Sequence, residues 1–294
     1  MRYVFAIVLS LLLQSVAYGW LSTRYPSGNM MQFVFIAFTL CTIFYELSLK
    51  IWPVPYEAAD LRAIQHIGIA TVFSYITFFA AMVFIPASVV SLAEISVGPL
   101  FSALLSMALL KIQGGIVKNR QDFWAANVFF LATFMAAILI VRSTEVSLGD
   151  RVWGLSLSAI AGLAASVIAL VCQSRLNQVN PRLVLARRFR LTCLVALIFG
   201  LTFEHWNWTW PFWSSSAVVA FIGIVLPMYL MQLGIQKVRP MITMLALAFV
   251  PATTYLSESL FSGQFDVWVS GLIIAAVGFA IVYTLLEHYW FKRV

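Results

Sequence analysis

The stretch that decides the fold runs from Ile85 to Leu110 and reads IPASVVSLAEISVGPLFSALLSMALL. As a helix it is long enough to cross a bilayer, for which about 20 apolar residues suffice. It carries one carboxylate, Glu94, and a charged side chain at that depth costs roughly 3 kcal/mol on insertion scales. Such residues usually face a cavity and have a function. The stretch therefore predicts a helix that forms the wall of a translocation pathway.

Glu94 belongs to a narrow row of small and polar residues on one side of this predicted helix. At helical spacing the row contains Ala87, Ser91, Glu94, Gly98 and Ser102. Pro99 has no N–H, so the carbonyl of Ile95 loses its intrahelical partner. In hydrocarbon a free carbonyl is tolerated only against protein or a water-filled cavity. Both features favour a position beside a cavity.

The rest of the chain is equally apolar. Of 294 residues, 62% are hydrophobic and 10% are charged, and the mean hydropathy is +0.95. This composition is typical of an all-α polytopic membrane protein. The net charge of +7 does not indicate a nucleic-acid partner, because the basic residues lie in connections between apolar spans. The N-terminus resembles a signal peptide, but its removal would leave an odd number of helices. We therefore expect it to remain as the first span.

Ten spans can be drawn along the sequence. They cover residues 3–22, 30–51, 64–84, 87–110, 124–142, 152–173, 189–206, 214–236, 240–262 and 266–287. With the N-terminus inside, 15 Lys and Arg residues fall in inner segments and three, Arg24, Arg142 and Arg151, fall in outer loops. Because positive charge marks the cytoplasmic side, both termini are predicted to be cytoplasmic. We expect an integral protein of the bacterial inner (cell) membrane.

The halves 1–142 and 143–294 repeat each other at a spacing of about 152–154 residues. The paired positions are Tyr75 with Tyr229, Pro86 with Pro240 and Pro99 with Pro251. Each half has five spans, and because five is odd the second half enters the membrane inverted. Two inverted five-helix repeats are an architecture of secondary transporters. In this alignment Glu94 has no acidic counterpart, since Ala246 takes its place.

Two segments carry a resemblance to a known family. They are FFAAMVFIPASVVSLAEISVGPLFSALLSMALL and YLMQLGIQKVRPMITMLALAFVPATTYLSESLF. They resemble the third-and-fourth-helix signature of the drug/metabolite transporter (DMT) superfamily, EamA-type permeases. Tyr18-Gly19 is similar to the family's aromatic-glycine pair, and Ser174-Arg175 to the polar end of its sixth helix. The chain has Leu110-Lys111 where the family often has a Gly-Glu pair.

The resemblance covers essentially the whole chain. It implies ten helices around a central cavity and transport of small metabolites, commonly export. It names no substrate, because the superfamily spans amino acids, nucleotide sugars, metallophores and drugs.

The candidate substrate-binding or coupling residues are polar groups within spans. They are Glu94, Ser91, Gly98, Tyr75, Tyr229, Gln14, Tyr18 and Gln232, with Pro99 and Pro251 as helix breaks. Glu94 has three alternative roles: proton coupling, contact with a substrate amine, or a protonated acid hydrogen-bonded to a neighbouring helix. No metal or cofactor is expected, because neither Cys/His ligand spacing nor a Gly-rich phosphate loop is present.

The cavity is expected to hold no cation, since no Lys or Arg falls near the middle of a predicted span. This disfavours phosphorylated substrates and favours an amine, a zwitterion or an aromatic compound such as an amino acid. The predicted function is a secondary transporter, most simply an exporter working by alternating access. The alternatives are export of a metallophore-type compound and a non-transporting scaffold or sensor. An enzyme is not expected, because one strong intramembrane ionisable site is too few. The partners are a small-molecule substrate and the lipid bilayer, and the protein is a monomer or a homodimer.

Overall fold

A computed structural model gives the fold of the chain. It describes residues 2–25, 28–112, 120–144, 146–238, 243 and 246–290. Within these ranges every regular element is helical. Pro240, the predicted counterpart of Pro86, lies outside the described residues.

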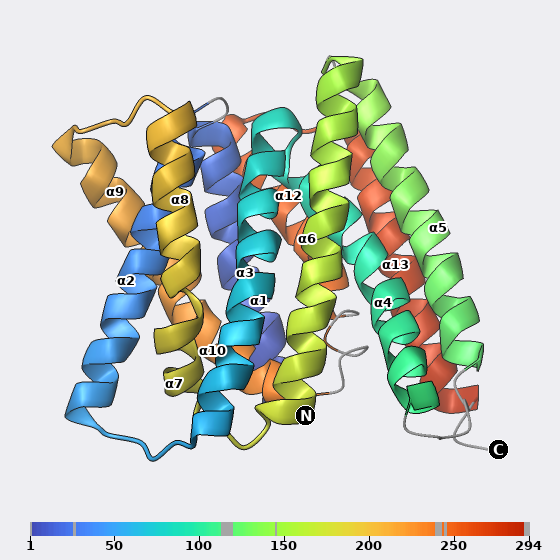
Figure 1. Ribbon diagram of the computed structural model, residues 1–294. Coiled ribbons are helices and arrows are strands. Elements are labelled where there is room, and N and C mark those ends of the chain that lie inside the picture. The colour runs from blue at the N-terminus through green and yellow to red at the C-terminus, as the bar shows by residue number, and fades with distance from the viewer. Residues whose placement is uncertain are drawn as a thin grey trace.

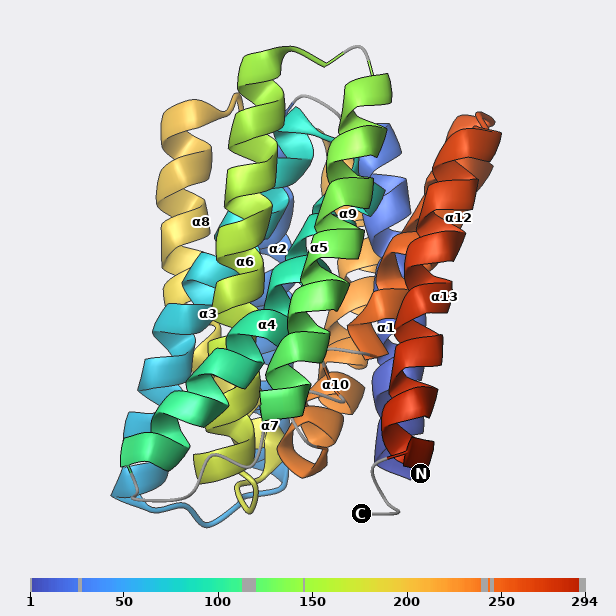
Figure 2. The same ribbon diagram turned by 90° about the vertical axis from the view of Figure 1, so that its right-hand side faces the viewer.

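The helices form one bundle in which successive crossings run in opposite directions (Figure 1). In order they are α1 (Arg2–Arg24), α2 (Met30–Ile51), α3 (Ala58–Phe84), α4 (Ala87–Ile112), α5 (Arg120–Ser143), α6 (Leu148–Arg175), α7 (Pro181–Arg188), α8 (Arg190–Phe203), α9 (Trp210–Ala220), the π-turn η1 (Phe221–Val225), α10 (Leu226–Lys237), the 3-10 turn η2 (Leu247–Phe249), α12 (Val250–Ser262) and α13 (Val267–Trp290). We call the end where α1 finishes and α2 begins the upper end, and the opposite end, which holds the N-terminus, the lower end (Figure 1). Turning the bundle by 90° shows α13 beside α5, which it contacts (Figure 2).

Six of the described helical segments are long and apolar enough to cross a membrane. They are Arg2–Arg24, Met30–Ile51, Asp60–Phe84, Ala87–Leu105, Leu148–Arg175 and Trp210–Lys237. Large apolar side chains also cover the outside of the bundle, including Phe5 at 67%, Leu131 at 60% and Ile274 at 66% exposed. Lipid is the solvent that such a surface requires. The chain is therefore a helical integral membrane protein.

Two pairs of helices approach each other closely at glycine residues. A Cβ atom at Gly162 of α6 would collide with the carbonyl oxygen of Glu94 in α4. A Cβ atom at Gly19 of α1 would collide in the same way with Ser257 of α12. Small residues let membrane helices approach this closely, and hydroxyl groups then bridge them. Ser166 Oγ donates to the Gly98 carbonyl at 2.9 Å across the α4–α6 contact.

The two prolines predicted to break helices occupy different positions. Pro99 lies inside α4, which continues past it, as predicted. Pro251 is the second residue of α12 and follows the 3-10 turn η2. The backbone is helical from Ala246 onward and changes from 3-10 to α geometry just before Pro251, so the proline follows an irregular turn in a continuous helical run.

The α7–α8 segment also departs from the predicted span 189–206. The helix begins at Pro181, where the Asn180 side chain accepts a hydrogen bond from the Arg182 N–H at 3.0 Å. An Asn cap followed by proline is a strong helix start. The segment rises as α7, turns at Phe189 and continues as α8 (Figure 1). This early start places Arg188 two turns inside the bundle.

Candidate functional site

A cavity lies in the middle of the bundle, between helices of both halves of the chain. Its volume is about 80 Å³, and it is partly open to the outside. Its lining residues are Leu11, Gln14, Tyr18, Ser74, Tyr75, Phe78, Glu94, Ala165, Ile168, Arg188, Met231, Ile235, Thr243, Leu247 and Val250. Glu94 and Arg188 are the charged members of this lining.

Glu94 reaches the cavity from the second turn of α4. Its side chain is partly exposed, and it takes part in none of the hydrogen bonds or ion pairs found within the described residues. The ion pairs found there join Glu46 to Arg187 and Arg190. A carboxylate without a partner in an apolar setting is costly unless a ligand, water or a proton reaches it. Glu94 is thus the acidic residue of the described cavity lining.

Arg188 is the group that the sequence analysis missed. It is 4% exposed and yet lines the same cavity. Its Nε donates to Thr71 Oγ1 at 3.2 Å and its Nη1 to Gln232 Oε1 at 2.7 Å. Its guanidinium also lies 4.8 Å from the centre of the Phe189 ring. The expectation that the cavity holds no cation is therefore wrong.

Arg188 was missed because the predicted seventh span begins at residue 189, one residue after it. A span that begins at residue 189 places Arg188 in the preceding connection, whereas the helix in the structure begins at Pro181. The Asn180-Pro181 pair and the apolar run Leu183, Val184, Leu185 and Ala186 carried the missing signal. That run is buried and packs α7 against the bundle.

Gln14 and Tyr18 form a directed chain of hydrogen bonds along α1. The Tyr18 hydroxyl donates to Gln14 Oε1 at 3.0 Å, and Gln14 Nε2 donates to Ser10 Oγ at 2.7 Å. Ser10 Oγ then donates to the carbonyl of Pro227 at 2.7 Å. The chain fixes both cavity residues and satisfies a carbonyl next to the π-turn η1. It joins α1 to α10, which belongs to the other half.

Tyr75 lies on the α3 side of the cavity. Its hydroxyl donates to Met228 Sδ at 3.3 Å. Its ring contacts Phe38 at 4.7 Å and Phe189 at 6.0 Å between ring centres. Tyr18 in turn contacts Phe78 at 5.0 Å. The cavity therefore has an aromatic wall whose rings are held by their neighbours.

The remaining predicted residues do not line the cavity. Ser91 is buried, and its hydroxyl has no hydrogen-bond partner in the part of the chain that the structure describes. Gly98 packs on α6 through its carbonyl, so the small residues of α4 bring that helix against α6. Tyr229 is 36% exposed and stacks on Tyr45 at 6.4 Å. Gln232 touches the site indirectly, since it accepts from Arg188 and donates to Cys172 Sγ at 3.5 Å.

Two carboxylates hold the upper end of the bundle. Glu258 of α12 accepts from Ser22 Oγ at 2.7 Å and from the backbone N–H groups of Ala87 and Ser88 at 2.9 and 3.3 Å. It therefore ties α12 to α1 and to the first turn of α4. Glu204, directly after α8, accepts from the N–H groups of Met31 and Gln32 at 2.8 and 3.0 Å. Negative groups are favourable at helix N-termini.

The pKa of Glu204 reflects two opposing effects. Partial burial raises the pKa of this carboxyl above its ordinary value, and the hydrogen bonds from the first turn of α2 oppose the rise. Burial is the larger effect.

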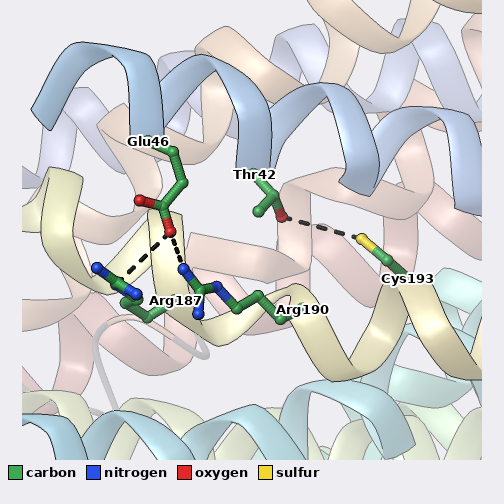
Figure 3. A network of polar contacts seen from close by, with 5 residues as sticks. All are labelled: Thr42, Glu46, Arg187, Arg190 and Cys193. Carbon is green, nitrogen blue, oxygen red and sulfur yellow. Dashed lines mark hydrogen bonds and ion pairs between the residues drawn. The ribbon is translucent and has the colours of Figure 1, made fainter. Parts of the chain in front are cut away.

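At the lower end Glu46 of α2 pairs with two arginines. Arg187 Nε lies 3.5 Å from Glu46 Oε1, and Arg190 donates to the same oxygen. Figure 3 shows both guanidinium groups converging on Glu46, while Thr42 points toward Cys193. These contacts join α2 to α7 and α8. Glu46 thus pairs with Arg187 and Arg190, whereas Arg188 lines the cavity.

Comparisons with known proteins show a likeness of fold to a solved structure. No family model matches the chain, and no curated protein does either. A solved structure described as "Crystal structure of protein" has a TM-score of 0.68 and 18% identity. The match covers 97% of this chain and 96% of that one. At this identity the likeness concerns the fold alone.

Proposed function

We propose that the protein is a secondary transporter that exports a small organic metabolite by alternating access. The observation that carries the proposal is the central cavity, which both halves line and which holds Glu94 and Arg188. Intramembrane charged groups that face a cavity mark substrate and ion pathways. A scaffold would need neither the cavity nor the cost of burying these groups.

The topology that we propose has ten spans in two inverted repeats. The segments α7–α8 and α9–η1–α10 each count as one span, and the last upward crossing contains η2 and α12. Reciprocal packing supports this arrangement: α4 of the first half packs on α6 of the second, and α12 of the second half packs on α1 of the first. Two related halves can interchange an inward-open and an outward-open state around one site.

We further propose that the protein is an EamA-type member of the drug/metabolite transporter superfamily. In this proposal it lies in the bacterial inner membrane with both termini in the cytoplasm. A cavity with a carboxylate, a guanidinium and an aromatic wall fits a small polar metabolite with an apolar part.

Comparative metabolite profiling tests the function. The compared cells carry the wild-type protein, Glu94→Gln or no protein, and both the medium and the cell interior are analysed. We expect at least one compound to accumulate in the medium with wild type only, because Glu94→Gln preserves shape and removes the charge and its titration. The compound is then measured in proteoliposomes with and without a pH gradient. Identical profiles in all three strains would contradict the proposal.

A further inference from the structure

The cavity contains two charges of opposite sign that are not paired with each other. Burying a single charge is expensive, and two buried opposite charges usually recover part of that cost by direct pairing. Here the guanidinium of Arg188 is held by Thr71 and Gln232, which are neutral acceptors. The carboxylate of Glu94 has no protein partner within the described residues. Both charges are therefore available to a ligand in the cavity.

Arg188 has donors to spare for a ligand. A guanidinium carries five N–H groups in a rigid fork, and Thr71 and Gln232 each accept one hydrogen bond. Three N–H groups remain after these contacts, with hydrogens left on both Nη atoms. This is the fork that binds a carboxylate through two parallel hydrogen bonds. The two neutral partners fix the plane of the guanidinium without cancelling its charge.

The wall of the cavity sets the nature of the rest of the ligand. Tyr18 and Phe78 form an aromatic contact on one side, and Ile168, Met231 and Val250 line the other parts. Such a wall suits an apolar or aromatic substituent. Within the described lining no second cation is present to receive a phosphate dianion.

We propose that the cavity binds a zwitterion, with Arg188 pairing to its carboxylate, Glu94 to its ammonium group and the aromatic wall to its apolar part. The inference rests on the proposed transport function and narrows it to one substrate class, that of amino acids and similar compounds. It also accounts for two opposite charges that line one cavity without pairing with each other. A ligand that carries both signs neutralises the two groups at once, whereas an amine or an acid alone leaves one buried charge uncompensated.

Binding to the purified full-length protein tests the proposal. The probes are the twenty common amino acids, β-alanine and 4-aminobutyrate, measured by isothermal titration calorimetry in detergent. The best binder is then compared with its amide, which lacks the carboxylate, and its N-acetyl derivative, which lacks the ammonium group. We expect both derivatives to bind at least about tenfold more weakly to wild type. Absence of binding throughout the panel, or equal binding of either derivative, overturns the proposal.

Two variants assign each charge to its partner. Glu94→Gln should weaken the zwitterion but not the N-acetyl compound, so their affinity ratio falls toward one. Arg188→Lys, which keeps the charge but loses the fork, should weaken the zwitterion about tenfold and hardly change the amide. A merely structural role would weaken all three compounds equally in either variant, and that pattern contradicts the assignment. Glu57→Gln, which removes an exposed carboxylate far from the cavity, is the matched control.

Transport measurements separate this inference from the proposed function. Export of a compound with only one charged group would leave the transporter intact and refute the zwitterion site. Tight binding of an amino acid without transport in proteoliposomes would support the zwitterion site and refute the proposed transport function.

Discussion

Glu204 is a carboxylate outside the membrane-spanning helices whose protonation is coupled to folding. Its pKa is raised by burial, against the opposing hydrogen bonds from Met31 and Gln32. The folded protein therefore holds this proton more tightly than the unfolded chain does. The contribution to stability is greatest below the ordinary glutamate pKa of 4.5 and declines as the pH rises through the raised value.

We predict that wild type loses stability relative to Glu204→Gln as the pH rises from about 4 to about 8. The measurement is the unfolding temperature of both purified proteins across this range. Glu57→Gln controls for the loss of one negative charge. If wild type instead gains relative stability with rising pH, the hydrogen bonds at the α2 N-terminus outweigh burial.

Glu94 is the residue whose substitution should alter transport without altering the fold. Among the residues that the structure describes it has no partner to lose, so Glu94→Gln should insert and express like wild type. We expect loss of pH-dependent transport, because glutamine cannot bind and release a proton. Rates are measured in proteoliposomes at several pH values. A wild-type rate and pH profile in Glu94→Gln would make Glu94 a structural residue.

Pro99 gives α4 a weak point beside the cavity. The carbonyl of Ile95 lacks the N–H that any other residue at position 99 would supply, while Gly162 holds the same helix one turn above. A helix weakened here can bend when the protein changes between its inward-open and outward-open states.

Pro99→Ala should therefore stiffen α4. Restoring one hydrogen bond adds about 1 kcal/mol to the straight helix, which corresponds to roughly fivefold in rate. We expect normal insertion and slower transport in proteoliposomes. Pro53→Ala, in the exposed α2–α3 connection, is the control. Equal rates for Pro99→Ala and wild type would reject a hinge at this position.

Glu258 is the tie between three helices at the upper end. Its carboxylate joins α12 to Ser22 of α1 and to the Ala87 and Ser88 N–H groups of α4. Hydrogen bonds to a charged group contribute about 1.5–3 kcal/mol each. Their loss should favour a state in which these helices separate.

Glu258→Gln should therefore expose the cavity from the upper side. The measurement is the labelling rate of Ser74→Cys, a buried cavity position, in a background without the three native cysteines. We expect at least about a fivefold faster reaction with a membrane-impermeant maleimide added on that side. Glu57→Gln, at the lower end, should leave the rate unchanged. No acceleration in Glu258→Gln would mean that Glu258 does not hold this end closed.

The charge asymmetry of the sequence predicts the orientation of the whole molecule in the membrane. Ser147, before α6, lies at the upper end, and Gln178, between α6 and α7, lies at the lower end; both are exposed. We predict that a cysteine at position 147 reacts only with reagent outside the cell and one at position 178 only from the cytoplasm. The reverse pattern would invert the topology.

Hydropathy predicted much of the bundle correctly. The stretch from Ile85 onward is α4 with Pro99 inside it, and Glu94, Gln14, Tyr18 and Tyr75 meet at one cavity. The incorrect predictions concern which side of a helix faces the cavity. In a helix that is apolar on most sides, the pattern does not specify which side meets a cavity, another helix or lipid. Ser91 and Gly98 consequently pack away from the cavity lining, and Tyr229 faces outward.

The sequence by itself determined that this is a helical membrane protein with a carboxylate placed inside the bilayer, because hydropathy is a property of each segment of about 20 residues. Only the tertiary structure decided that Arg188 shares the cavity with Glu94. Its position depends on where α7 begins and on the packing of that helix against Thr71 and Gln232, which lie 117 and 44 residues away in the chain. Such contacts arise from the way helices pack, and they turned a predicted acidic site into one that carries both charges.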